Sequence, residues 1–290
     1  MYTKEIILSY LSANLSARLA HIDAGCFEKM TELRIRADKP VFAYAEGREM
    51  EFCAGFLPGA SEIAETVERI SSYSLYALEE ELRNGYITLP GGHRVGLVGK
   101  AVVEGRSLRT IRPISGLNIR ISREVVGCGA VVLPRILDSC GPGKKLPCNT
   151  MLISPPGCGK TTMLRDIIRL LSDECLLKVG VVDERSEIGG SYKGVAQNNV
   201  GLRTDLLDGC PKAEGMMLLL RAMSPDVIAV DELGGEADME AVERVSNAGV
   251  RLLCTVHGYG MEDVRRKKGV FKRFVVLEAP GKEAKIYDCG

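Results

Sequence analysis

Aromatic side chains are scarce in this chain. Its 290 residues include no tryptophan, six phenylalanines and nine tyrosines. Residues 106–123 carry five arginines but no aromatic residue, so this basic stretch lacks the stacking platforms on which nucleic-acid bases bind. We therefore expect no nucleic-acid partner.

Net charge and long apolar runs are also absent. The 38 Lys and Arg residues balance 38 Asp and Glu residues, so no overall field draws the chain to nucleic acid or to an anionic membrane. No apolar run approaches the roughly 18 residues of a membrane-spanning helix. The first five residues, Met-Tyr-Thr-Lys-Glu, are too polar and acidic to begin a typical signal peptide. We expect a cytoplasmic protein without direct membrane insertion.

Metal-binding cysteine patterns are missing too. Ten cysteines are scattered through the chain, no two of them stand at C-x-x-C spacing, and only three histidines are present. Structural zinc sites need closely spaced cysteine and histidine ligands. The pattern favours reduced thiols over a zinc centre.

A phosphate-binding loop is the most informative feature that is present. Residues 154–161 read Ser-Pro-Pro-Gly-Cys-Gly-Lys-Thr and join an apolar run to an amphipathic stretch. In a strand–loop–helix arrangement, the loop N–H groups surround an anion at the positive end of the helix. The pattern G-x-x-x-x-G-K-[ST] is met except at its first position. We expect nucleotide triphosphate binding by Ser154, Pro155, Pro156, Gly157, Cys158, Gly159, Lys160, Thr161 and Thr162.

A second acidic motif supports the same chemistry. Residues 227–230 form a continuous apolar run, typical of a parallel strand buried on both faces, and Asp231 and Glu232 follow it. An Asp at this position binds the Mg²⁺ shell, and a following Glu can activate the attacking water. We therefore expect ATP and Mg²⁺ as cofactors, with Lys160 on the β- and γ-phosphates and Thr161 and Asp231 as the Mg²⁺ residues.

Further candidates follow from position in the same half of the chain. Another apolar strand ends in the acidic residues Asp183, Glu184 and Glu187, and Glu187 is a second candidate for activating water. His257 ends a later strand, where it can sense the γ-phosphate. Arg203 and Arg221 are candidates for an arginine supplied to the nucleotide of a neighbouring subunit, an arrangement that requires a ring.

The length of the chain favours two domains. We expect a smaller α+β domain over residues 1–124, with a one-sided helix at Ile63, Val67 and Ile70 and a hairpin of two short strands, 86–89 and 94–98. Residues 130–137 are expected to form a helix, which residues 141–145 break.

Strand and helix patterns alternate over the second domain, residues 125–290. We expect strands at 149–153, 178–182, 227–230 and 251–256, helices at 160–171, 212–223 and 237–247, a long glycine-containing segment at 184–211, and a closing hairpin of 272–277 and 284–288. Such alternation predicts an α/β fold, here a RecA-like P-loop NTPase core with a mostly parallel sheet and helices on both faces.

Four longer runs resemble a known family. They are Gly-Tyr-Ile-Thr-Leu-Pro-Gly-Gly-His-Arg-Val-Gly at 85–96, Asp-Glu-Arg-Ser-Glu-Ile at 183–188, Arg-Thr-Asp-Leu-Leu-Asp-Gly-Cys-Pro-Lys at 203–212 and Met-Ser-Pro-Asp at 223–226. They are similar to the stage III sporulation protein AA family of endospore-forming bacteria, over nearly the whole chain.

The resemblance implies an ATPase related to the hexameric motors of type II and type IV secretion systems. It implies action in the mother cell, beside membrane proteins of a channel complex that reaches the forespore. Asp183, Glu184 and Glu187 match the acidic box of those motors, and His257 matches their histidine box. Because those motors carry Gly-Glu where this chain has Asp231-Glu232, the water-activating acid stays open between Glu232 and Glu187.

The leading interpretation is an ATP hydrolase whose subunits form a ring, expected to be a hexamer. Two alternatives remain open. One is a nucleic-acid-dependent ATPase of the recombinase or helicase kind, and the other is an ATP-binding switch or scaffold with little turnover.

Overall fold

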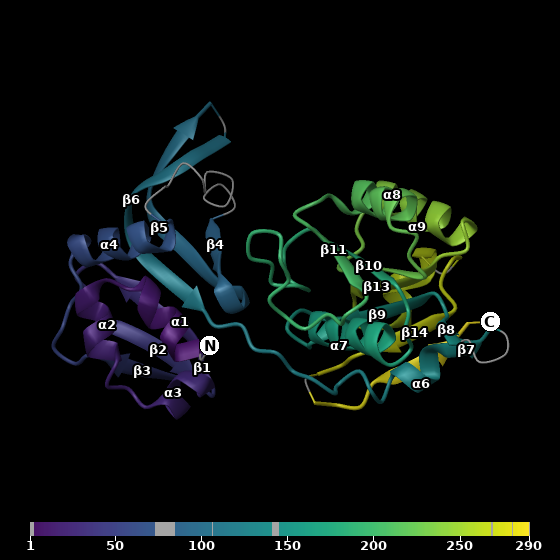
Figure 1. The fold of residues 1–290 in the computed structure, drawn as a ribbon, viewed down its shortest axis with the longest axis horizontal. Coiled ribbons are helices and arrows are strands. Elements are labelled where there is room, and N and C mark those ends of the chain that lie inside the picture. The colour runs from purple at the N-terminus through teal and green to yellow at the C-terminus, as the bar shows by residue number, and fades with distance from the viewer. Residues whose placement is uncertain are drawn as a thin grey trace. The chain divides into compact units, whose positions relative to one another are not determined.

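The structure is a computed structural model that describes residues 3–72, 85–105, 107–140, 145–267, 269–279 and 281–289. Its chain divides into two compact units, Met1–Arg123 and Glu124–Gly290 (Figure 1). Arg106 of the arginine cluster and residues 141–144 of the expected helix break lie outside the described residues.

The first unit is an α+β domain. Its elements are α1 (Thr3–Tyr10), α2 (Ala13–Leu19), α3 (Ala24–Lys29), β1 (Met30–Arg36), β2 (Val41–Ala45), β3 (Arg48–Phe52), α4 (Ala60–Ile70), β4 (Tyr86–Leu89), β5 (His93–Glu104) and β6 (Ser107–Arg120). The strands form an antiparallel sheet in the order β3-β2-β1-β6-β5-β4. Alternate residues such as Leu33 and Ile35 are buried and pack with helix residues such as Leu15 and Ile63. The sheet therefore buries one face, as period-two alternation requires.

The predicted helix and hairpin are both present in this unit. Helix α4 buries Ile63, Val67 and Ile70 on one side. Strands β4 and β5 pair antiparallel through the turn Pro90–Gly92, in which Gly91 takes the left-handed φ of 81°. The expected second strand, 94–98, was too short, because β5 continues to Glu104 by pairing with β6. Residues beyond Leu97 are exposed there, so no buried apolar pattern marks the extension.

The second unit holds α6 (Leu133–Ile136), β7 (Leu137–Ser139), β8 (Lys145–Pro147), β9 (Thr150–Ser154), α7 (Lys160–Asp173), β10 (Val179–Asp183), β11 (Thr204–Asp208), α8 (Lys212–Ala222), β12 (Val227–Val230), α9 (Glu236–Asn247), β13 (Arg251–His257), β14 (Arg273–Val276) and β15 (Lys285–Asp288). Its main sheet has the order β11-β10-β12-β13-β9-β14-β15. Neighbouring strands are parallel except for β14 and β15, which form the predicted antiparallel hairpin at the edge.

Three layers build this unit (Figure 1). Successive residues of each strand face opposite sides of the sheet. Val227 and Ala229 therefore pack with α7, while Ile228 and Val230 pack with α8 and α9. Both faces of the sheet are covered, which explains why its strands read as continuous apolar runs. The parallel order brings the carboxyl ends of β9, β10, β12 and β13 to one edge.

Two expectations for this unit were wrong. Strand β11 lies inside the segment 184–211, which was expected to hold no strand, and all five of its residues are half-buried at the sheet edge. The helix expected over 130–137 is reduced to the four residues of α6, because Leu137 already pairs with Pro147 in the β7–β8 hairpin.

None of the helices in the described part of the chain is long and apolar enough to cross a membrane.

Candidate nucleotide-binding site

The phosphate loop connects the buried end of β9 to the first turn of α7. Gly157 and Gly159 take φ angles of 76° and 85°, and a Cβ added at either would meet no atom within 4 Å. The two glycines therefore supply left-handed turns in an open cradle, whose N–H groups lie at the start of a 14-residue helix. Ser154 is fully buried at the end of β9, and its hydroxyl donates to the Pro155 carbonyl at 2.9 Å. Serine in place of the first glycine of the motif therefore leaves the turn intact.

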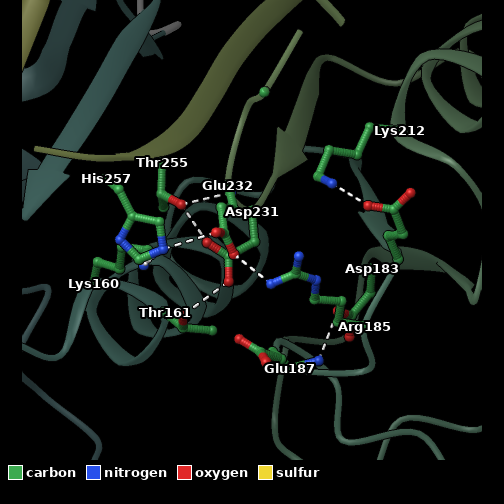
Figure 2. Close-up of polar contacts among 12 residues, drawn as sticks. Lys160, Thr161, Asp183, Arg185, Glu187, Lys212, Asp231, Glu232, Thr255 and His257 are labelled. Carbon is green, nitrogen blue, oxygen red and sulfur yellow. Dashed lines mark hydrogen bonds and ion pairs between the residues drawn. The ribbon is translucent and has the colours of Figure 1, made fainter. Parts of the chain in front are cut away.

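Thr161 and Asp231 meet at the carboxyl edge of the sheet. The Thr161 hydroxyl donates to Oδ2 of Asp231 at 2.8 Å, and the Thr255 hydroxyl from β13 donates to the other carboxylate oxygen (Figure 2). Asp231 is 9% exposed. Two neighbouring elements thus fix the carboxylate beside the first turn of α7.

Glu232 lies next to this pair with an unusual backbone. Its φ is 56°, and its N–H donates to the Thr255 hydroxyl at 2.8 Å. The carboxylate contacts His257 Nε2 through Oε1 at 2.7 Å and Arg185 Nη1 through Oε2 at 2.9 Å. The left-handed turn lets Asp231 and Glu232 both face the site although they are adjacent in sequence.

Lys160 is held beside the same group. It is 9% exposed, and its Nζ lies 3.1 Å from His257 Nδ1. His257 ends β13, which pairs with β9 and places the imidazole beside the phosphate loop. The structure therefore brings together five of the predicted residues: Lys160, Thr161, Asp231, Glu232 and His257 (Figure 2).

The loop after β10 is fixed by a buried carboxylate and a buried guanidinium. Asp183 accepts the N–H groups of Glu187, Ile188 and Gly189 at 2.8, 3.0 and 2.8 Å. Arg165 from α7 donates to the carbonyls of Ile188 and Glu187 at 2.6 and 2.7 Å. Burial raises the pKa of Asp183 despite its three N–H donors, and burial lowers the pKa of Arg165.

This double attachment fixes the position of Glu187. Its carboxyl group points toward Thr161 and the end of β12 (Figure 2), and it lines the same pocket as Asp231 and Glu232. The pocket is lined by five carboxylates and two cations, which are Asp183, Glu184, Glu187, Asp231, Glu232, Arg185 and Lys212. Lys212, at the start of α8, forms an ion pair with Glu184.

Arg203 and Arg221 lie elsewhere in the unit. The Arg203 carbonyl accepts the N–H of Val179 at the start of β10, and the Arg203 side chain donates to Ser172. Arg221 is in the last turn of α8, which leads into the start of β12. Both therefore lie at the amino edge of the sheet, opposite the phosphate loop of the same chain.

The remaining loop residues line the approach to α7. The Cys158 thiol lies 3.5 Å from the Glu278 carbonyl after β14, and the Thr162 carbonyl lies 3.7 Å from the Cys128 thiol. Pro155 is half-buried and Pro156 is exposed. The loop thus rests between the end of β14 and the segment that precedes α6.

Sequence reasoning assigned no role to four residues of the site. Thr255 orders Asp231 and Glu232, Arg165 holds the loop after β10, and Arg185 and Lys212 bring positive charge to the pocket. For Thr255 a signal existed, since it is a polar residue inside a buried apolar strand. The partners of Arg165, Arg185 and Lys212 lie on elements distant in sequence, so no local pattern announces them.

The donor atoms suit Mg²⁺. Thr161 offers a hydroxyl oxygen and Asp231 a carboxylate, both hard ligands, at one place beside the phosphate loop. Within the described residues, no three His, Cys, Asp or Glu side chains are placed to hold a metal ion together. A metal bound here would complete its shell with phosphate oxygens and water, which is how Mg²⁺ is usually held.

Residues 1–289 match the family model described as sporulation stage III, protein AA. The chain belongs to this family. Stage III sporulation protein AA of Bacillus subtilis (strain 168) is 37% identical to it over 298 residues, which cover 97% of this chain and 94% of that protein. The family resemblance inferred from the motifs is thereby confirmed.

Solved structures of an ATPase and of a pilus retraction motor have folds similar to that of this family member. The ATPase DotB of Legionella pneumophila matches with a TM-score of 0.55 and 16% identity, over 85% of this chain and 72% of that one. The pilus retraction motor PilT with bound ADP matches with a TM-score of 0.57 and 14% identity, over 87% and 75%. These likenesses establish the predicted α/β P-loop NTPase fold with its mostly parallel sheet.

Proposed function

We propose that this chain binds ATP with Mg²⁺ at the phosphate loop and hydrolyses it. The observation that carries the proposal is the convergence of Lys160, Thr161 and Asp231 at the start of α7, with Glu232 beside them. The fold it shares with the ATPase DotB and with PilT, whose solved structure holds ADP, supports the proposal.

The bound Mg²⁺–triphosphate would supply the electrophilic phosphorus and the cation that withdraws charge from it. Lys160 then places a buried positive charge beside the phosphate oxygens. The loop N–H groups donate to the same oxygens at the positive end of the helix dipole. Thr161 and Asp231 would hold the metal. Glu232 orients the attacking water and accepts its proton, with Glu187 as the alternative acid at the same pocket.

As a finer proposal, the subunits form a ring, expected to be a hexamer, in which Arg203 or Arg221 reaches a neighbour's nucleotide. Their position at the amino edge keeps them from the site of their own chain, which is compatible with action in trans. The ring would energise a sporulation channel at the membrane between mother cell and forespore, held there by membrane proteins. Family membership supports this setting.

Phosphate release tests the proposal. Purified protein is expected to release phosphate from ATP in the presence of Mg²⁺ and to stop when Mg²⁺ is chelated. Tight ATP binding with negligible phosphate release in a single turnover would instead favour the switch or scaffold. Stimulation by single-stranded DNA that falls steeply with salt would favour the nucleic-acid-dependent ATPase.

A further inference from the structure

Both carboxylate oxygens of Glu232 contact basic side chains, one from a loop and one from the end of a strand. Arg185, from the loop after β10, bonds to Oε2, while His257, at the end of β13, bonds to Oε1 (Figure 2). The Arg185 side chain is 62% exposed and that of Glu232 is 26% exposed. The ion pair thus joins an exposed guanidinium to a half-buried carboxylate.

His257 is also in contact with the phosphate-binding lysine, whose Nζ lies 3.1 Å from Nδ1 and 3.2 Å from Nε2. Because Nε2 lies 2.7 Å from a carboxylate oxygen, it carries a proton and donates. With that proton on Nε2, Nδ1 is the ring nitrogen that can accept from the Lys160 ammonium. Lys160, His257, Glu232 and Arg185 thus form one continuous chain of polar contacts, which we call the charge chain.

The charge chain has an electrostatic consequence for phosphate binding. A phosphate group that Lys160 binds approaches the carboxylate of Glu232, which is one imidazole away. Like charges in a partly buried site repel strongly because solvent screens them poorly. Asp231 and Glu187 line the same pocket and add to the negative field. The nearby Lys212 is already paired with Glu184, which leaves the guanidinium of Arg185 in contact with Glu232.

We infer that Arg185 is a positioning residue for Glu232. Its guanidinium neutralises the carboxylate and holds it against His257, so that a nucleotide triphosphate can bind beside an acid that is needed for hydrolysis. The inference rests on the proposed function. It assigns Arg185 no contact with the phosphate itself, and this separates it from an arginine that acts directly on the nucleotide.

A double-mutant cycle of binding tests the inference. The dissociation constant of a non-hydrolysable ATP analogue with Mg²⁺ is measured by calorimetric titration for wild type, R185Q, E232Q and the double variant. We expect R185Q to weaken binding about tenfold when Glu232 is present and less than about twofold in the E232Q background, since the repelling charge is then gone. ADP, which lacks the terminal phosphate, is expected to lose less affinity than the analogue.

Two further variants serve as controls. R185K keeps the positive charge and is expected to restore binding to within about threefold of wild type. R244Q makes the same chemical change on the exposed surface of α9 and is expected to leave affinity unchanged. Matching thermal unfolding profiles show that each variant is folded, and if R185Q does not fold, wild type, R185K and E232Q still report the effect of the charge.

Three results would overturn the inference. An equal loss of affinity for R185Q in both backgrounds means that Arg185 contacts the nucleotide directly. No loss in either background means that the Arg185–Glu232 contact is a surface ion pair without function. Failure of R185K to restore binding when R185Q weakens it excludes charge neutralisation. If wild type itself binds no nucleotide, the proposed function fails, which is a different outcome from these.

Discussion

At the scale of single residues, the charged groups of the site satisfy one another. Glu232 is paired with His257 and Arg185, Asp231 accepts two threonine hydroxyls, and Lys160 is docked on His257. Buried or half-buried charges are costly without such partners. A nucleotide with its metal must therefore replace contacts that already exist.

Lys160 is the residue whose loss should be most damaging. Lys160→Ala removes the buried positive charge at the loop, so we expect phosphate release to fall on the order of 100-fold or more. Steady-state phosphate release measures this. Lys178→Ala, an exposed lysine at the opposite edge of the sheet, is the matched control and should retain full turnover. Retained turnover in Lys160→Ala would place the chemistry elsewhere.

The two candidate acids can be separated by conservative substitution. Glu232→Gln keeps the shape of the side chain but removes the base, so nucleotide binding should persist while turnover falls roughly 100-fold or more. Glu187→Gln should retain most of its turnover. Binding titrations and phosphate release on both variants decide the matter, because the reverse result would assign water activation to Glu187.

At the scale of elements, the loop after β10 is the most constrained part of the site. Asp183 holds its N–H groups, and Arg165 holds its carbonyls, from opposite sides of the backbone. A loop fixed in this way presents Glu187 in one position. The rigidity comes from buried side chains and not from secondary structure.

Arg165→Met should release this loop. The substitution removes the Arg165 donor from the carbonyls of Glu187 and Ile188, of which Ile188 keeps the Asn198 amide as a donor, so the free energy of unfolding should fall by about 2 kcal/mol. Urea unfolding measures the change. Arg244→Gln on the exposed surface of α9 should change stability by about 0.5 kcal/mol or less. A similarly small effect in Arg165→Met would show that the loop does not depend on the guanidinium.

His93, at the start of β5, makes the first unit sensitive to acid. It is 2% exposed, its Nδ1 accepts the Ser122 N–H at 3.1 Å, and burial lowers its pKa from the ordinary 6.5. The unfolded chain therefore takes up a proton before the folded one does. The stability that neutral His93 contributes is full above pH 6.5 and is lost as the pH falls from there toward the lowered pKa.

The expected result is a stability loss of up to about 1.4 kcal/mol per pH unit in that window, absent from His93→Gln. Urea unfolding of both proteins at pH 7.5 and pH 5.5 measures it. Parallel losses in wild type and variant would contradict the assignment to His93.

The elements that sequence could predict share a physical cause. Strands β9, β10, β12 and β13 are buried on both faces and therefore appear as apolar runs. Strand β11 lies at the edge, is half-buried throughout and carries aspartates at both ends of its apolar pair, so its sequence resembles a loop. Lys160, Thr161, Asp231 and Glu232 could be predicted because they follow such runs. The contact of Arg185 could not be predicted, because its partner Glu232 follows β12, and only the fold makes β12 the neighbour of β10.

At the scale of the whole molecule, the proposed ring is the step with the clearest readout. A chain of 31.5 kDa that assembles into a hexamer has a mass of about 190 kDa. Glu232→Gln should hold ATP without hydrolysing it and so stabilise the assembly. We expect light scattering after size exclusion to give this mass for Glu232→Gln with ATP and Mg²⁺, and a smaller mass without nucleotide. A monomer under both conditions would remove the basis for arginines acting in trans.

The most direct test of the central claim is a crystal structure with a non-hydrolysable ATP analogue and Mg²⁺. The account predicts a triphosphate enclosed by residues 154–161, with the metal between the Thr161 hydroxyl and Asp231 and with Glu232 facing the terminal phosphate. An empty phosphate loop, or a nucleotide bound away from Asp231, would contradict it.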